Sequence, residues 1–245
     1  MTYQSSPEIS FIVPCYNEAG NIASTLETIM TFMKDHDCLY EILVVDDGSI
    51  DSTSDAVRIY CEAHPQVPVS VQINRKNLGL GRNYLDGAQR ARGRYYMLVN
   101  GDNDIRAADL SAIVARRGTA DMIIPFVANQ YDRPIVRNLV SRLFTVIVNA
   151  TGGHLLKYYN GPVLHLRENV LRFEPPASGH GYQAELLCRT LSAGCTYEEV
   201  PFYSVRSIHN RSSAFRFANM VSVVKSLVRI YIHRFRRATA KAQKL

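Results

Sequence analysis

The sequence predicts an α/β fold with a doubly wound, mostly parallel sheet, followed by a C-terminal amphipathic helix. Over the first half of the chain, short apolar runs alternate with longer segments in which apolar residues recur at helical spacing. The run 42–45 is apolar throughout, which is typical of a strand buried on both faces of a parallel sheet. It ends abruptly in two carboxylates and a Gly-Ser turn. Open α/β sheets bind their ligands at such strand ends.

Four predicted strands, separated by helices, occupy the first half of the chain. The strands are expected at 9–13, 41–46, 69–73 and 94–99. The helices are expected at about 19–36, at 51–64 and from the loop 74–81 to about residue 91. Pro14 is expected to end the first strand. Strand–helix alternation at these lengths requires parallel strands.

The second half is less regular. It contains a predicted strand at 121–125, a strongly apolar helix at 135–150, a strand-like segment at 160–166, a helix at 182–193, one or two strands around Pro201 within 196–205, and a final helix at 214–237. A length of 245 residues suits one large α/β domain with a short appendage.

Positive charge is concentrated at the C-terminus. Ten Lys and Arg residues and no Asp or Glu lie within 206–245, in a chain of net charge +6. This asymmetry indicates an anionic partner, and because no base-reading motif or aromatic stacking platform is recognisable, a membrane is favoured over nucleic acid. Five cysteines without CxxC spacing, with no signal peptide and no uncharged apolar run of spanning length, predict a cytoplasmic protein without a transmembrane helix.

Polar stretches follow each of the first four strands, and the topology should bring them to one edge of the sheet. They are 14–18, 46–49, 77–81 and 100–104. Acids at this edge are poorly solvated unless a ribose, a base edge or a metal occupies the crevice, which indicates an enzyme site. Gly79 and Gly81 permit close approach of the backbone, although a plain turn before a helix explains them equally well.

Asp102 and Asp104, alternate residues of an extended segment, are the predicted metal ligands. Hard carboxylate oxygens combined with substrate phosphate oxygens suit Mg²⁺ or Mn²⁺. The alternative is an Asx-rich turn whose carboxylates cap a helix that starts at Ala107.

These stretches together resemble the family 2 glycosyltransferases of the GT-A fold, and among them the polyprenol- or dolichol-phosphate sugar transferases. The motifs are Ile12-Val-Pro-Cys-Tyr-Asn-Glu18, Val44-Val-Asp-Asp-Gly-Ser49, Asn77-Leu-Gly-Leu-Gly81 and Asn100-Gly-Asp-Asn-Asp104. The resemblance implies inverting transfer of a sugar from a nucleotide-diphosphate sugar to a polyprenyl phosphate. It also implies a nucleotide site formed by Pro14, Tyr16, Glu18, Asp46, Asp47, Gly79, Asn100 and Asp102, with Asp46 holding the base edge or the ribose.

At the metal site the chain departs from the family's usual Asp-Ala-Asp-Leu-Gln. In one register Asn100 replaces the first Asp, Asp102 matches the second and Asp104 matches the Gln. In the other, Asp102-Asn-Asp104 is the family's Asp-x-Asp. Either register retains two carboxylates, and the resemblance makes Asp102, Asp104 and Arg137 the catalytic residues.

The resemblance assigns further basic residues to the two phosphate groups. Arg133, Arg137 and Arg142 match the residues that meet the lipid phosphate, and Arg206, Arg211 and Ser212 lie in the region of a loop that closes over the diphosphate. Asn160 is a further candidate for contact with the sugar or the diphosphate. Glu185 is expected either to orient a sugar hydroxyl or to lie on a helix surface.

The final helix combines a broad apolar face with basic residues at Lys225, Arg229 and Arg236. This pattern predicts either an interfacial helix on an anionic bilayer or a helix packed on the domain. We therefore expect a catalytic domain at 1–213, with a nucleotide-binding half at about 8–125 and an acceptor half at about 126–213. The basic helix and tail at 214–245 would hold the enzyme on the cytoplasmic face of a membrane. Alternatives are a soluble glycan or peptide acceptor, or a non-catalytic nucleotide-sugar binding module.

Overall fold

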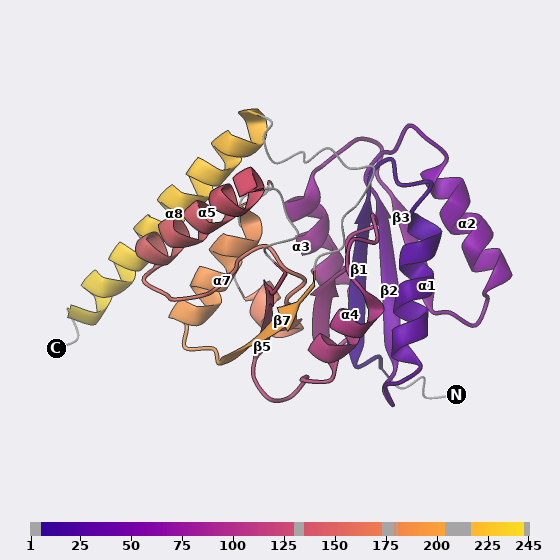
Figure 1. Ribbon diagram of the computed structural model, residues 1–245, viewed down its shortest axis with the longest axis horizontal. Coiled ribbons are helices and arrows are strands. Elements are labelled where there is room, and N and C mark those ends of the chain that lie inside the picture. Colours follow the sequence, from indigo (N-terminus) through magenta and orange to yellow (C-terminus); the bar gives the residue numbers. More distant parts are fainter. Residues whose placement is uncertain (1–5, 130–134, 173–178, 180, 204–216, 243–245) are drawn as a thin grey trace.

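A seven-stranded sheet forms the centre of the molecule (Figure 1). The computed structural model describes residues 6–129, 135–172, 179, 181–203 and 217–242. The strands are β1 Ile9–Cys15, β2 Tyr40–Asp46, β3 Val69–Ile73, β4 Tyr95–Leu98, β5 Met122–Val127, β6 Leu164–Leu166 and β7 Tyr197–Phe202. Their order is β3-β2-β1-β4-β6-β5-β7, and among these seven β6 alone runs antiparallel to its neighbours. The predicted mostly parallel sheet is confirmed.

Helices cover both faces of this sheet. They are α1 Ile22–Met33, α2 Thr53–Ala63, α3 Leu80–Arg90, α4 Ala107–Val114, α5 Ile135–Gly152, α6 Arg167–Leu171, α7 Tyr182–Ser192 and α8 Phe217–Ala242. Consecutive strand residues alternate between two cores: Phe11 packs with α1, α2 and α4, whereas Ile12 packs with α3, α6 and α7. This two-sided burial is the reason the central strands β1, β2 and β4 are mainly apolar, whereas the edge strands β3 and β7 are partly exposed.

Two prolines lie inside strands, contrary to the expectation that Pro14 ends the first strand. β1 continues through Pro14 to Cys15. Pro14 stays paired with Val45 of β2, and its carbonyl oxygen accepts a hydrogen bond from the N–H of Gly101, just beyond the end of β4. Pro201 lies within the single strand β7 at the edge of the sheet, where proline is tolerated. The predicted strand at 160–166 shrinks to the three residues of β6.

The C-terminal helix α8 packs on the domain beside α5 and α7 (Figure 1). Leu227 and Ile230 join Phe144 and Val148 of α5 in a third hydrophobic core. Arg234 donates a hydrogen bond from Nη1 to the carbonyl oxygen of Ala150 at 2.7 Å, near the C-terminal end of α5. Within the described residues no helix has the length and apolar character needed to span a bilayer.

Candidate active site

The loops after β1 and β2 interlock at the carboxyl edge of the sheet. The backbone N–H of Asn17 donates to Ser49 Oγ, and the N–H of Ile50 donates to Asn17 Oδ1, each at 2.9 Å. Asn17 adopts a φ of 58° to make this exchange. The adjacent Tyr16, a predicted nucleotide contact, is 44% exposed at this edge. The convergence of these two strand ends is thus held by hydrogen bonds as well as by topology.

Asp46 is almost fully buried and shapes the turn from β2 into α2. Its Oδ1 accepts a hydrogen bond from the backbone N–H of Ser49 at 2.9 Å, and its Oδ2 accepts one from Ser54 Oγ. The carboxylate predicted to contact the base edge or the ribose therefore also fixes the backbone of the loop around it.

Asp47, also buried, anchors the loop that joins β3 to α3. Its Oδ1 accepts from Asn74 Nδ2 at 2.9 Å and from the N–H of Leu78 at 2.8 Å, and its Oδ2 accepts from the N–H of Gly79 at 2.9 Å. Gly79 has a φ of 89°, the left-handed region that glycine adopts without strain. The third strand end is thereby tied to the second.

The acidic motif 100–104 follows β4 directly and is held by α1. Thr25 Oγ1 donates to the carbonyl oxygen of Gly101 at 3.0 Å, and Thr28 Oγ1 donates to Asn103 Oδ1 at 3.0 Å. A side chain at Gly101 would place its Cβ 2.9 Å from Cys15 Cβ, so only glycine fits against β1 here. The Oδ1 atoms of Asp102 and Asp104 are shielded from solvent. The N-cap residue of α4 is Arg106, not either acid.

Negative charge accumulates where these loops meet. Burial raises the pKa of Glu18, and the nearby charges of Asp102 and Asp51 raise it further, against a hydrogen bond from Asn21. Burial and the surrounding carboxylates raise the pKa of Cys15, beneath the loops, to about 12. A cation at this edge would offset the repulsion.

The donor set at the edge fits Mg²⁺ or Mn²⁺ bound jointly with a substrate. Within the described part of the chain, no group of three or more His, Cys, Asp or Glu side chains is arranged to hold a metal. Asp102 and Asp104 supply hard oxygen atoms, and a bound diphosphate would supply others. Such shared coordination is usual for Mg²⁺ beside phosphate groups.

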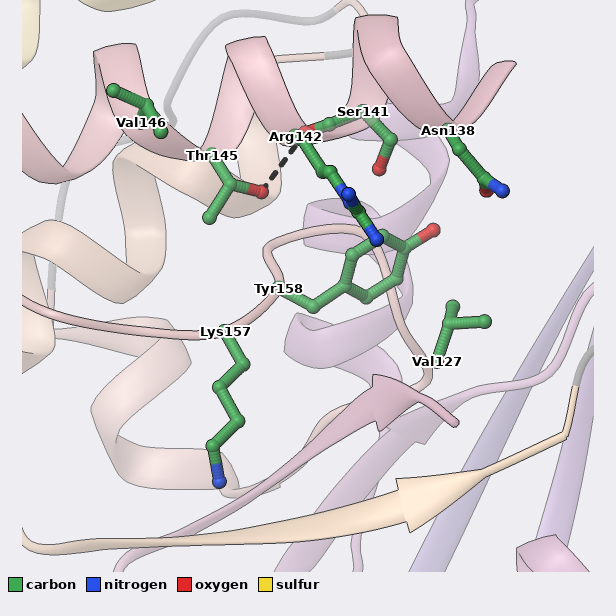
Figure 2. Close-up of a pocket in the computed structure, with 8 residues that line it drawn as sticks. All are labelled: Val127, Asn138, Ser141, Arg142, Thr145, Val146, Lys157 and Tyr158. Atoms are coloured by element: carbon green, nitrogen blue, oxygen red, sulfur yellow. Dashed lines mark hydrogen bonds between the residues drawn. The ribbon is translucent and has the colours of Figure 1, made fainter. Parts of the chain in front are cut away.

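A pocket of about 240 Å³ lies beside the end of β5 (Figure 2). Its walls come from α5, β5 and the segment 157–158, and its lining residues are Val127, Asn138, Ser141, Arg142, Thr145, Val146, Lys157 and Tyr158. Arg142 extends from α5 toward the ring of Tyr158, whereas Lys157 points away from it (Figure 2). Lys157 Nζ instead lies 3.4 Å from Glu199 Oε2. The pocket thus presents one guanidinium among hydroxyl and amide groups.

Several sequence-predicted residues cannot be located in this way. Arg133, Arg206, Arg211 and Ser212 lie outside the described residues, and for Arg137 only its place in α5, one turn before Ser141, is described. Asn160 is exposed, in the turn before Gly161. Glu185 was expected on a surface or at the sugar, but its side chain is fully buried between α7 and α8, 2.6 Å from Arg189 Nη2.

Sequence reasoning missed several residues of the pocket wall and the two threonines of α1 that hold the acidic motif 100–104. Ser141 and Thr145 could have been noticed as polar residues four apart in an apolar helix that also carries Arg137. Thr25 and Thr28 carried no sequence signal, because threonines inside an amphipathic helix are common and their partners are more than 70 residues away.

The sequence model described as "Glycosyl transferase family 2" matches residues 10–175, more than half of the chain. The chain belongs to this family. Among family 2 relatives, it is 33% identical over 110 residues to dolichyl-phosphate beta-glucosyltransferase from Dictyostelium discoideum, covering 43% of this chain and 34% of that protein. It is 25% identical over 169 residues to dodecaprenyl-phosphate galacturonate synthase from Rhizobium johnstonii, covering 68% and 50%. The chain therefore spans between a third and a half of the length of these two relatives.

Solved structures agree with this family 2 assignment at the level of the fold. A mannosyltransferase from Pyrobaculum calidifontis, in complex with GDP-Man and Mn²⁺, superposes with a TM-score of 0.64 at 20% identity, covering 95% of this chain and 65% of that one. Glucosyl-3-phosphoglycerate synthase from Mycobacterium tuberculosis, in complex with Mn²⁺, UDP-Glc and phosphoglyceric acid, superposes with a TM-score of 0.70 at 20% identity. This match covers 92% of this chain and 80% of that one. The predicted GT-A fold and the resemblance to polyprenyl-phosphate sugar transferases are confirmed.

Proposed function

We propose that this family 2 protein transfers a sugar, with inversion, from a nucleotide-diphosphate sugar to a polyprenyl phosphate. One structural relationship carries the proposal. β5 runs in the same direction as β4, since both are antiparallel to β6, so the Arg142 pocket and the acidic motif stand at the same edge of one sheet. An acidic edge suits a cation-bound diphosphate, and a basic pocket suits an anionic acceptor.

The donor would bind over the interlocked loops of β1, β2 and β3. Pro14, Tyr16, Glu18 and Asn100 would border the nucleotide, with Asp46, Asp47 and Gly79 shaping the loops around it. Asp102 and Asp104 would hold Mg²⁺ or Mn²⁺, which when bound neutralises the developing charge of the diphosphate leaving group. Arg206, Arg211 and Ser212 would add contacts to the diphosphate.

The acceptor phosphate would bind in the pocket on α5. Because a phosphate oxygen is already an anion near neutral pH, the protein needs to position it rather than remove a proton. Arg142 would hold the phosphate through charge-assisted hydrogen bonds, with the hydroxyl of Ser141 beside it. Arg137, one helical turn before Ser141, and Arg133 would complete the site. The protein would act on the cytoplasmic face of a membrane, which it meets through α8.

Product analysis tests this proposal against the two alternatives. The protein is incubated with radiolabelled UDP- or GDP-sugar, Mg²⁺ or Mn²⁺, and dolichyl or undecaprenyl phosphate, and the mixture is extracted into organic solvent. Label in the lipid phase supports the proposal. Label moved only to a soluble glycan or peptide would replace it with the first alternative. An intact donor under every condition, together with a thermal shift on adding sugar nucleotide, would identify a binding module.

A further inference from the structure

An exposed apolar ridge runs along α5. Five large apolar side chains on this helix are each more than half exposed: Ile135, Val136, Leu139, Leu143 and Val146. They recur at three- and four-residue steps, so they form one stripe, while Val148 on the other side of the helix is fully buried. Contiguous apolar surface of this kind usually marks an interaction site.

A second ridge runs along α8. Val224, Val228, Tyr231 and Phe235 are each more than half exposed, at steps of four, three and four residues. The opposite side of the helix packs on the domain, where Ser226 and Ile230 are each 2% exposed. The domain core therefore does not cover this apolar stripe, as it would for an ordinary surface helix.

The two ridges belong to the same end of the molecule. α5 and α8 lie side by side, at the end farthest from α1 and α2 (Figure 1). Their inward residues share one hydrophobic core. We call the nine exposed side chains of these two ridges the two-helix apolar surface.

Charge at this surface is of one sign. Neither α5 nor α8 contains an Asp or Glu. Lys225 and Arg236 are exposed, eleven positions apart and therefore three turns along the same side of α8, and neither forms an ion pair with a described residue. Arg229 and Arg234 are engaged within the protein: Arg229 Nη1 lies 3.7 Å from Glu185 Oε2, and Arg234 binds the end of α5. Among the α8 side chains that the structure describes, the available cations are thus Lys225 and Arg236.

We propose that the two-helix apolar surface docks on an anionic bilayer, with α5 and α8 both lying in the interface and Lys225 and Arg236 contacting lipid phosphates. A bilayer accepts apolar and basic groups together. A second copy of the chain would instead bring the same cations and no carboxylates against them, and like charges oppose that contact. The occupant is therefore lipid rather than another protomer.

The acceptor pocket opens at the border of this surface. Val146 lines the pocket and also belongs to the α5 ridge, and Arg142 stands one turn before it. On the proposed function, a polyprenyl phosphate would reach Arg142 with its headgroup while its chain stays in the bilayer. This link rests on the proposed function; the docking surface itself does not.

Vesicle flotation tests the docking surface. The full chain is mixed with vesicles of phosphatidylcholine alone or with phosphatidylglycerol added. We expect binding to the anionic vesicles, and a loss of at least about tenfold in affinity for L139Q/L143Q, for V224Q/V228Q and for K225E/R236E. The matched controls are L39Q/I59Q, at two apolar positions more than half exposed on other parts of the molecule, and K34E/R90E, with the same change in net charge. Circular dichroism and gel filtration verify that each variant is folded.

The outcomes separate the docking surface from the proposed function. Equal flotation of the α5 variant and its control would overturn the role of α5, and absence of wild-type flotation would overturn the surface as a whole. A concentration-dependent dimer that the Gln variants abolish would replace lipid with a second copy. Transfer to a short, water-soluble prenyl phosphate is expected to survive in L139Q/L143Q while transfer to long-chain acceptor in vesicles falls. Flotation without transfer to either acceptor would refute the function and leave the surface standing.

Discussion

Asp47 accepts a hydrogen bond from the backbone N–H of Gly79, with 2.9 Å between its Oδ2 and the nitrogen. Asp47 directly follows β2 and Gly79 directly precedes α3, and together with the bonds to Oδ1 this contact holds the β3–α3 loop at the carboxyl edge of the sheet. The Asp47 carboxylate therefore has a structural role, holding this loop, that is separate from any contact with a substrate.

Asp47→Ala should therefore destabilise the protein as well as impair donor binding. The substitution leaves two backbone N–H groups and the Asn74 amide without their acceptor, and we expect a loss of about 3 kcal/mol in the free energy of unfolding. Urea denaturation measures it. Asp55→Ala, at an exposed carboxylate on α2, is the control and should change stability by about 0.5 kcal/mol or less. A fall in activity at unchanged stability would contradict the anchoring role.

Gly101→Ala tests the close approach of the acidic motif to β1. A Cβ there would lie 2.9 Å from Cys15 Cβ and 3.2 Å from the carbonyl oxygen of Pro14, so the motif must shift. We expect at least about a hundredfold loss of kcat, because small displacements of catalytic groups cost rate steeply. Gly20→Ala, where a Cβ has nothing within 4 Å, should keep full activity. Equal kcat in both variants would count against the motif's role.

Asp102→Asn should sharply reduce turnover at every metal concentration. The change keeps the shape of the side chain but removes the charge that a divalent cation requires, and we expect a loss of about a hundredfold to a thousandfold in kcat. Steady-state kinetics across an Mg²⁺ or Mn²⁺ titration provide the measurement. Asp86→Asn, at a carboxylate paired with Arg82 on α3, is the control. Recovery of the wild-type kcat at saturating metal would exclude Asp102 as a ligand.

Arg142→Ala and Arg137→Ala should each raise the acceptor KM more than the donor KM. A charge-assisted hydrogen bond to phosphate contributes about 2 kcal/mol, which corresponds to a roughly thirtyfold rise in KM. Arg58→Ala removes an arginine of α2 that pairs only with Asp55 and Glu62 among the described residues, and it should change neither constant. Parallel increases in both KM values would indicate a general structural effect instead of a phosphate site.

His165→Leu should flatten the pH dependence of stability. Both ring nitrogens of His165 lack a hydrogen-bond partner within the described structure, and burial lowers the pKa of this histidine to about 3. The folded state favours the neutral ring, so this contribution is fully present above the unfolded pKa of 6.5 and is lost as the pH falls from there toward the folded value. At about pH 5 the loss in the wild type is about 2 kcal/mol.

Urea unfolding at about pH 7.5 and about pH 5 measures this difference. The variant should lose less stability than the wild type between the two conditions. It should also be at least as stable near neutral pH, because a buried donor without a partner is removed. His64→Leu, at a partly exposed position stacked on Tyr60, is the matched histidine control. An identical pH dependence in His165→Leu and wild type would exclude the buried imidazole as its source.

Strands β1, β2 and β4 could be predicted because each is buried on both faces and ends in a polar turn. The edge strand Val69–Ile73, which is largely exposed, was also predicted residue for residue. The end of β1 could not be predicted, because whether proline ends a strand depends on the pairing of its neighbours, and β2 stays paired with β1 as far as Cys15. The helix α6 was missed, and the strand predicted at 160–166 was too long for β6, since three to five residues are too few to establish a period.

In the candidate site, too, some residues could be predicted from the sequence and others could not. Asp102 and Asp104 could be singled out because carboxylates after a buried strand have few structural uses, and the site assignment itself stays a prediction. The hydrogen bonds by which Asp47 anchors a loop, and the one by which Thr25 holds the acidic motif, could not be predicted. They depend on contacts between segments far apart in sequence. For α8 the sequence left both an exposed interfacial helix and a helix packed on the domain open, because periodicity does not tell which side of a helix meets the core.

The placement of α8 limits how the protein can be made more soluble for biochemistry. Removing the helix would strip Ile230 from the interior, leave the carboxylate of Glu185 without Arg229, and uncover the end of α5 that Arg234 binds. A chain without α8 would therefore expose these interior apolar side chains to solvent and aggregate. Polar replacements on the outward side of the helix are the safer route to a tractable sample.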